Sequence, residues 1–375
     1  MGRFCAAVLF LAACGDNLGP AIDEDTGIQL APERTNLNGE TVDVVPGSPL
    51  PGLCGSSTYS VSFDNPKDAT IAVAGMHGID GVFSVQRGTP GLSGFSFSNE
   101  MTLLSNPTLT VPTTFQALTA SAIDSKAFAV GFDGSKISVE MFDLPIAQQS
   151  EIFTTNATTV GRVVQLGRDR VVAYGTDKGL AMMPFTDHWR PTTEVMVGVS
   201  KPVTSLSIAQ NGTDEVLATW TTSDKQCFVQ RIDKLVQGTP VGTPHACDNV
   251  QIAGEFGGKQ ARVIYTNADN ELHYAAVSGT QLVEDRMVRP DVIAPKLAFD
   301  GIHYWVTYTN SRKQIVNGFF DDTDGGDGSL VSMALPDTFV DGSSFDMSVI
   351  DGGVPYVVTL DPINGFGANK LCVTR

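Results

Sequence analysis

The chain has 375 residues, 42% of them hydrophobic, and its 38 glycines and 20 prolines are spread along its length. This composition is typical of an all-β protein that is dense in turns and long enough to bury a large core. The formal net charge of −17 argues against nucleic acid as a partner, because phosphate backbones select basic surfaces. No stretch reaches the ~20 apolar residues that a membrane-spanning helix needs.

The chain begins with the pattern of an export signal. Arg3 precedes an apolar run over residues 4–13, which is too short to span a bilayer. Residues 11–14 read Leu-Ala-Ala-Cys, which resembles the lipobox of bacterial lipoproteins. The resemblance implies that residues 1–13 are a lipoprotein signal peptide and that Cys14 is lipidated. It also implies an outer-membrane anchor, at the periplasmic face or the cell surface. The alternative is an ordinary signal peptide with an incidental cysteine.

Two further regions follow the signal peptide. Residues 14–50 contain GDNLGPAIDEDTG and VVPGSPLPG, which predict a flexible acidic and Pro/Gly-rich tether. Residues 51–375 show no break in composition, so we expect them to form one domain.

A repeat organises this domain. A short apolar strand between two turns recurs seven times, with equivalent positions 56, 44, 46, 45, 43 and 51 residues apart. This is the spacing of four-stranded propeller blades. We therefore predict an all-β fold, a seven-bladed β-propeller of about 45-residue four-stranded blades that is closed by an N-terminal strand, with an insertion in the first blade. The equivalent positions are Ala74, Val130, Tyr174, Trp220, Tyr265, Tyr308 and Thr359.

One blade has a family resemblance. The stretch from Ala294 to Gly325 contains Ala-Phe-Asp-Gly followed by an aromatic-led apolar strand, and it resembles a repeat of exported bacterial β-propeller proteins. The resemblance supports the propeller and names no activity. An acidic residue also recurs between the first and second strands of six blades, as at Asp300, where we expect it to shape a tight turn rather than a functional ring of carboxylates.

Four cysteines of the mature domain allow three pairings. The last blade ends after its third strand, so residues 50–56 are expected to supply its outermost strand, and Cys54 would then bond to Cys372. Cys227 opens the third strand of blade 4 and Cys247 precedes the first strand of blade 5, on the same face, so we predict a second bond there. A cysteine metal site is the alternative, but no paired spacing supports it.

A calcium site is the one cofactor that the sequence suggests. Asp322, Asp324 and Asp327 stand in a run of carboxylates and glycines that could wrap oxygen ligands around Ca²⁺. The run departs from the EF-hand pattern, and a solvated acidic turn is the alternative reading.

A ligand-binding loop is suggested after the third strand of blade 3. His188, Trp189 and Arg190 form a polar and aromatic cluster in which the tryptophan could stack on a sugar ring. The alternative is a tryptophan that caps the edge of the core. The other histidines lie in four different blades and form no close pair in the sequence: His77, His245, His273 and His303.

No catalytic residue stands out, which favours a binding protein over an enzyme. We predict a lipid-anchored envelope or surface propeller that binds a protein or a glycan. The alternatives are an exported propeller hydrolase or lyase acting on polysaccharide or small esters, and a scaffold subunit of an envelope assembly. Propellers can assemble sites from distant blades, which a single sequence does not reveal.

Overall fold

A computed structural model describes most of residues 33–374. The described ranges are 33–37, 40–44, 50–59, 71–76, 81–88, 91–98, 103–105, 108–109, 115–123, 126–143, 147–186, 188–199, 201–254, 260–278, 281–320, 330–338, 344–350, 353–361 and 365–374. In these ranges, no helix is long and apolar enough to cross a membrane.

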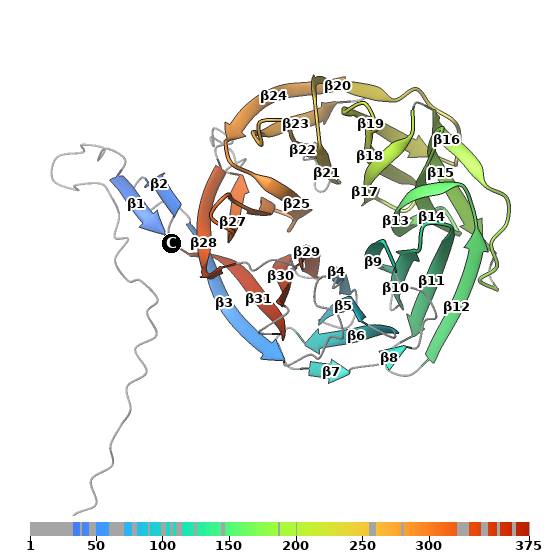
Figure 1. Cartoon of the computed structure of the whole chain (residues 1–375), viewed down its shortest axis with the longest axis horizontal. Coiled ribbons are helices and arrows are strands. Elements are labelled where there is room, and N and C mark those ends of the chain that lie inside the picture. The colour runs from blue at the N-terminus through green and yellow to red at the C-terminus, as the bar shows by residue number, and fades with distance from the viewer. Residues whose placement is uncertain are drawn as a thin grey trace, which may run out of the picture.

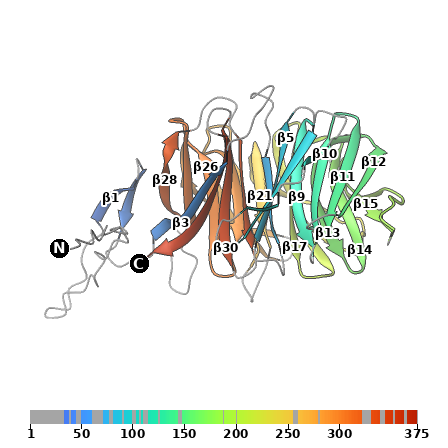
Figure 2. The same cartoon turned by 90° about the horizontal axis from the view of Figure 1, so that it is seen from below.

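The strands form antiparallel sheets that stand around a central axis, as Figure 1 shows from above and Figure 2 from the side. We number these sheets as blades in chain order. Blade 1 contains β4 (Ile71–Met76), β5 (Gly81–Gly88), β6 (Gly91–Ser98), β7 (Leu103–Ser105) and β8 (Thr108–Leu109). Blade 2 contains β9 (Ala117–Ile123), β10 (Lys126–Phe132), β11 (Lys136–Asp143) and β12 (Ala147–Thr154). Blade 3 contains β13 (Ala157–Leu166), β14 (Asp169–Thr176), β15 (Gly179–Phe185) and β16 (Val195–Val199).

The remaining blades continue the ring. Blade 4 contains β17 (Val203–Asn211), β18 (Glu215–Thr222), β19 (Gln226–Asp233) and β20 (Val241–Ala246). Blade 5 contains β21 (Asn249–Ala253), β22 (Arg262–Thr266), β23 (Leu272–Ser278) and β24 (Gln281–Arg289). Blade 6 contains β25 (Ile293–Phe299), β26 (Tyr304–Thr309), β27 (Gln314–Phe320) and β28 (Leu330–Thr338). Blade 7 contains β29 (Ser344–Ile350), β30 (Val354–Asp361), β31 (Gly365–Thr374) and β3 (Leu50–Tyr59).

The predicted all-β propeller is confirmed, but the prediction of equal four-stranded blades is corrected. Six sheets have four strands, whereas blade 1 has five, because β7 and β8 both pair with β6. The register of blade 1 also differs from the prediction. The strand that contains Ala74 was expected to be equivalent to the strand of Val130, which is the second of its blade, yet β4 lies beside β9 and β29, the innermost strands of the adjacent blades. Phe83, which pairs with Ala74, lies 47 residues before Val130, so this shift by one strand explains the long first spacing.

The N-terminal strand β3 pairs with the C-terminal strand β31, with Gly52 opposite Cys372. Cys54 lies at a register shift of β3 and forms a disulfide with Cys372, their Cα atoms 5.9 Å apart. The outermost strand of blade 7 thus comes from the opposite end of the chain. The segment that was expected to be a tether contains a separate hairpin, β1 (Glu33–Leu37) with β2 (Glu40–Val44), and this hairpin contacts β28 (Figure 1).

The core lies between successive blades. In blades 2 to 7 the second strand is buried along most of its length, as in β18 and β26, because a neighbouring blade covers each of its faces. The recurring positions of the sequence fill these layers: Val130, Tyr174, Trp220, Tyr265 and Tyr308 are all buried.

Hydrogen bonds between blades repeat with the period of the sequence. Gln165 and Gln210 occupy equivalent positions of blades 3 and 4, and the amide of Gln210 bonds to both the N–H (2.8 Å) and the carbonyl (2.7 Å) of Gln165. The Thr158 hydroxyl donates to the carbonyl of Val203, which lies 45 residues later. One period of the sequence therefore equals one step around the ring.

The acidic turn of blade 6 has a structural role. One carboxylate oxygen of Asp300 accepts the backbone N–H groups of Ile302 (2.7 Å) and His303 (2.6 Å), and the other accepts the indole N–H of Trp305 at 2.6 Å. Burial disfavours the charged carboxylate, but a hydrogen bond with the His303 side chain and these three hydrogen bonds prevail and hold the pKa of Asp300 below its usual value. The next turn packs closely against it, because a Cβ at Gly353 would lie 2.3 Å from the Asp300 carbonyl oxygen.

Candidate functional site

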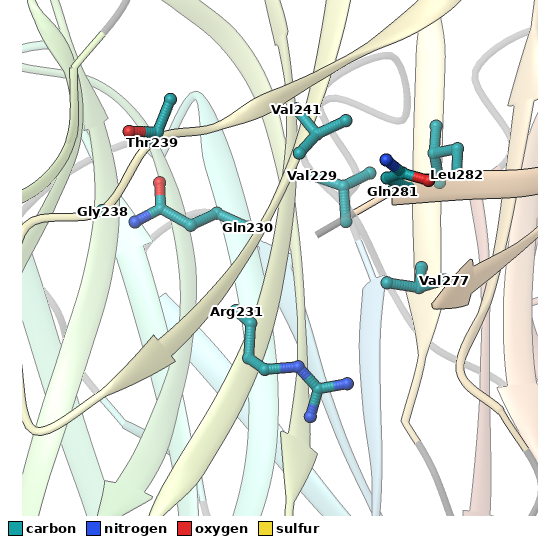
Figure 3. A pocket seen from close by; sticks show the side chains of 9 residues that line it. All are labelled: Val229, Gln230, Arg231, Gly238, Thr239, Val241, Val277, Gln281 and Leu282. Atoms are coloured by element: carbon teal, nitrogen blue, oxygen red, sulfur yellow. The ribbon is translucent and has the colours of Figure 1, made fainter. Parts of the chain in front are cut away.

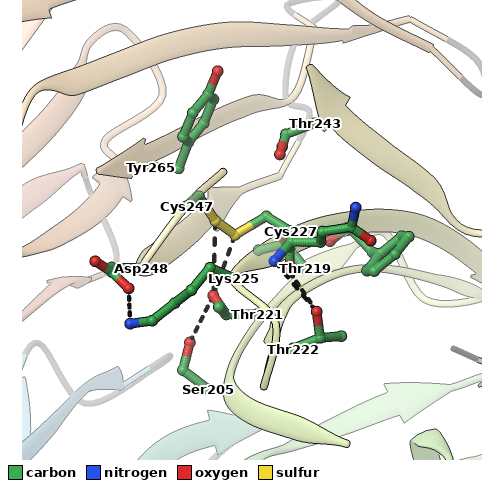
Figure 4. The surroundings of a disulfide bond; sticks show 12 residues. Ser205, Thr219, Thr221, Thr222, Lys225, Cys227, Thr243, Cys247, Asp248 and Tyr265 are labelled. Carbon is green, nitrogen blue, oxygen red and sulfur yellow. Dashed lines mark hydrogen bonds and ion pairs between the residues drawn. A yellow bond between two sulfur atoms is a disulfide. The ribbon is translucent and has the colours of Figure 1, made fainter. Parts of the chain in front are cut away.

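The strongest candidate site lies where the outer strands of blade 4 meet blade 5. The predicted disulfide between Cys227 and Cys247 is present here, buried, with Cα atoms 5.8 Å apart. The N–H of Cys247 donates to the carbonyl of Lys225 (2.8 Å), and the Lys225 ammonium pairs with Asp248. Figure 4 shows the bond close to Tyr265 of blade 5, with the hydroxyl of Thr221 facing both sulfur atoms. These contacts hold the end of β20 against β19 and blade 5.

A pocket of about 150 Å³ opens between these blades (Figure 3). Four aliphatic side chains line it, from both blades, and polar groups of Gln, Thr and Arg surround them. The volume is well below the ~300–1,000 Å³ of typical small-molecule sites, so the pocket has room for one ring-sized group. The lining residues are Val229, Gln230, Arg231, Gly238, Thr239, Val241, Val277, Gln281 and Leu282.

Two polar side chains of the pocket are fixed by their neighbours. The Gln230 amide is 4% exposed and turns toward blade 3, where it donates to the carbonyl of Val197 at 2.6 Å and its oxygen Oε1 packs against Gly198. The guanidinium of Arg231 pairs with Glu215.

A polar cluster lies at the same interface between blades 4 and 5, formed by His245 of β20, His273 of β23 and Asp285 of β24. His273 Nδ1 lies 3.4 Å from Asp285 Oδ1, and His245 Nε2 lies 3.8 Å from Asp285 Oδ2. His273 is buried, whereas the His245 side chain is 57% exposed. The cluster therefore reaches from the interior of the interface to its surface.

A β-bulge aims Asp285 at the histidines. Between the pairs Tyr274–Arg286 and Ala276–Val283 the register of β23 and β24 shifts, so Glu284 and Asp285 together face a single residue of β23. Glu284 has a φ of 57°, a conformation that few residues other than glycine adopt readily. Bulges of this kind redirect side chains and are common next to functional sites.

Tyr265 contacts two members of the cluster, His273 and Asp285. Its ring is stacked on that of His273 with centroids 4.8 Å apart, and its hydroxyl donates to Asp285 Oδ2 at 2.6 Å. Burial and the adjacent carboxylate raise the pKa of Tyr265 well above its usual value. The phenol therefore stays protonated, and so a hydrogen-bond donor, at neutral pH.

The residues of the predicted ligand-binding loop do not converge on a pocket. His188 is exposed, but Trp189 is only 3% exposed and stacks on Phe185 with centroids 4.6 Å apart. Arg190 forms an ion pair of 2.6 Å with Glu151 of blade 2. The indole thus caps the core between blades 2 and 3, which matches the alternative reading of this loop. The predicted lipidation site Cys14 and the predicted calcium ligands Asp322, Asp324 and Asp327 lie outside the described residues.

The histidine cluster was missed because its members are far apart in the chain. His245 and His273 are separated by 28 residues and belong to different blades, yet their ring centroids lie 5.0 Å apart. The histidines therefore form no close pair in the sequence, but His245 and His273 do form one in the folded protein. A usable signal was present, because His245 stands two residues before a cysteine that was already predicted to bond across the blade edge.

The fold defines the chain as a β-propeller, and comparisons with known proteins agree. No protein-family model and no curated protein matches the sequence. The structure is similar to that of BBS1N in complex with ARL6DN, soaked with mercury, with a TM-score of 0.55 and 11% identity over 87% of this chain and 98% of that chain. It is also similar to AofleA from Arthrobotrys oligospora, with a TM-score of 0.52 and 9% identity over 76% of this chain and 90% of that one. At such low identity the likeness shows the fold alone.

Proposed function

We propose that this protein is a binding module, a ring of seven blades closed by β3, that recognises a terminal sugar of a glycan in the pocket between blades 4 and 5. The pocket itself carries this proposal, because it combines an apolar surface with convergent polar groups in a space of about 150 Å³. The aliphatic side chains can cover the C–H face of a sugar ring. The side chains of Thr239 and Gln281 also line the pocket and can exchange hydrogen bonds with ring hydroxyls.

We also propose that the protein is exported and held at the outer membrane through lipid on Cys14. The apolar run and lipobox-like residues 11–14 support this, and the segment 14–50 would hold the propeller away from the bilayer. Metabolic labelling with a fatty acid tests this part: we expect labelled wild type and unlabelled Cys14→Ser. Label on both proteins would reject lipidation at Cys14.

A glycan array followed by calorimetry tests the binding function. We expect the full chain to bind a restricted set of glycans, and Val241→Trp, which fills the pocket, to weaken the best one at least tenfold. Val236→Trp is the matched control, because Val236 is 65% exposed and does not line the pocket. Equal loss in both variants, or no glycan bound by the wild type, would reject the proposal.

A hydrolase acting on polysaccharide or small esters is the second candidate function. The convergence of His245, His273 and Asp285 at one interface favours it, since general acid–base chemistry uses these groups close together. Turnover of chromogenic esters or glycosides by the wild type, and its loss in Asp285→Asn, would establish it. A protein partner is the remaining reading, and pull-down from envelope extracts with wild type and Val241→Trp would separate it from glycan binding.

A further inference from the structure

We infer that His245, His273 and Asp285 bind one divalent transition-metal ion, such as Zn²⁺, at the rim between blades 4 and 5. The site is distinct from the neighbouring sugar pocket, and its occupation does not depend on glycan binding or on catalysis.

The spacing of the three side chains suits a tetrahedral ion. One ligand atom from each residue lies within 4.8 Å of the other two. Metal–ligand bonds of about 2.0–2.2 Å place neighbouring ligands of a tetrahedron roughly 3.3–3.5 Å apart. The 3.4 Å between Asp285 Oδ1 and His273 Nδ1 matches this edge length, and His245 Nε2 lies 3.8 Å from the other carboxylate oxygen, Oδ2. Because His245 is exposed, a small rotation of its side chain closes the remaining difference.

Unpartnered buried atoms give independent support. His273 is 7% exposed, and both its Nδ1 and Asp285 Oδ1 are buried without any hydrogen-bond partner among the described residues. The two atoms face each other at 3.4 Å but are not aligned as a hydrogen bond. Buried polar atoms normally find partners, and a shared cation would satisfy this nitrogen and this oxygen together.

The surrounding residues fix the proposed ligands in place. Tyr265 holds Asp285 Oδ2 by a hydrogen bond of 2.6 Å, which leaves Oδ1 to face His273. The bulge at Glu284 sets the direction of Asp285, and the bond between Cys227 and Cys247 secures the strand end that carries His245. Support of this kind is usual around metal-binding carboxylates and histidines.

The ligand types select the ion. Two imidazoles and one carboxylate suit Zn²⁺ and its neighbours in the first transition series, whereas Ca²⁺ and Mg²⁺ prefer oxygen ligands only. Three protein ligands leave a fourth position for water or for an exogenous group, and the exposed His245 provides the path of entry.

Titration of the full-length chain with Zn²⁺ and Co²⁺ tests the inference. The protein is purified with its disulfides intact and stripped with a chelator. We expect one Zn²⁺ per chain by calorimetry, and visible Co²⁺ absorption bands of the strength that a tetrahedral site produces. Zn²⁺ should also raise the Tm of the wild type. Excess Ca²⁺ should not displace the Co²⁺ signal.

Variants locate the site. His245→Ala, at an exposed position, should weaken Zn²⁺ binding at least tenfold while leaving the metal-free Tm unchanged, and the isosteric Asp285→Asn should do the same to affinity. His188→Ala is the control, since His188 is an exposed histidine of blade 3. An absence of saturable binding would overturn the inference, as would equal affinity of wild type and His245→Ala. Glycan binding measured with and without chelator keeps failure here distinct from failure of the sugar pocket.

Discussion

Tyr265 and Tyr174 occupy equivalent positions of blades 5 and 3, and each donates its hydroxyl to a carboxylate 20 residues further along the chain. Tyr265 donates to Asp285 at 2.6 Å and Tyr174 to Glu194 at 2.5 Å. The buried tyrosine–carboxylate pair is therefore a repeated feature of the propeller. In blade 5, His245 and His273 join the pair, and a structural feature of the repeat becomes part of a candidate metal site.

The two tyrosines offer a matched test of this relationship. Tyr265→Phe should lower the free energy of unfolding by about 1–3 kcal/mol, because it leaves the Asp285 carboxylate without this donor. Tyr174→Phe should cost less, because Glu194 is exposed and still accepts a hydrogen bond from the Thr155 hydroxyl. Only Tyr265→Phe should also weaken Zn²⁺ binding, by about 10–100-fold. Urea denaturation and calorimetry measure the two effects. Equal Zn²⁺ affinity in both variants would show that Tyr265 does not orient the Asp285 carboxylate.

The buried tyrosines should make the protein sensitive to alkali. Burial raises the pKa of Tyr356 to about 12, above the ~10 of an unfolded chain. The native state therefore holds this proton more tightly, so its contribution to stability is complete below pH 10 and is lost as the pH rises from 10 to about 12. Denaturation at a series of pH values should show this decline. In Tyr356→Phe the slope between pH 10 and 12 should be shallower, and an unchanged slope would contradict the assignment.

The turn carboxylate of blade 6 should matter for stability. Asp300→Ala removes the acceptor of the buried Trp305 indole and should cost about 2–4 kcal/mol of unfolding free energy. Because the folded pKa of Asp300 is lowered, its contribution is present above the unfolded pKa of ~3.9 and is lost as the pH falls through the folded pKa.

Asp133→Ala is the control for this turn. Asp133 accepts the backbone N–H groups of Ser135 and Lys136 but holds no buried indole. Its loss should therefore be smaller in the same denaturation experiment. An equal cost for the two variants would show that the Trp305 bond contributes little.

The two disulfides should differ in their reactivity. Cys54 is exposed, whereas Cys227 and Cys247 are buried, so a mild reductant acting on the native protein should open the bond between Cys54 and Cys372 first. Alkylation and mass spectrometry of the trapped thiols measure the order. The exposed bond spans 318 residues, and Cys54→Ser should cost about 3–5 kcal/mol. Earlier labelling of Cys227 would contradict this order.

Trp189 should behave as a core residue. Trp189→Ala should lower the free energy of unfolding by about 3–5 kcal/mol, because the indole packs on Phe185 and Phe128 between two blades. Its glycan affinity, measured at a temperature at which the variant is folded, should equal that of the wild type. A tenfold loss of affinity with little loss of stability would support the ligand-binding prediction for this loop.

The sequence by itself determined the class of fold and both disulfides. The spacing of buried positions such as Tyr174 and Trp220 carries this information, because each blade must present the same apolar residues to its neighbours. The pairing of Cys227 with Cys247 followed from the same period, since the period assigns each cysteine to the edge of a blade. The order of the strands in blade 1 could not be predicted in this way, because the apolar pattern around Ala74 fits the first strand of a blade as well as the second.

Only the tertiary structure decided where the polar groups converge. The repeat predicts which strands are neighbours, but it does not predict that a bulge at Glu284 turns Asp285 toward two histidines of different strands. It also could not tell whether the indole of Trp189 points outward or into the core, since either orientation fits the same loop sequence. Buried positions that recur at a regular spacing can be recognised in the sequence. The location of a site cannot, because it depends on the directions of the side chains, which the packing between blades determines.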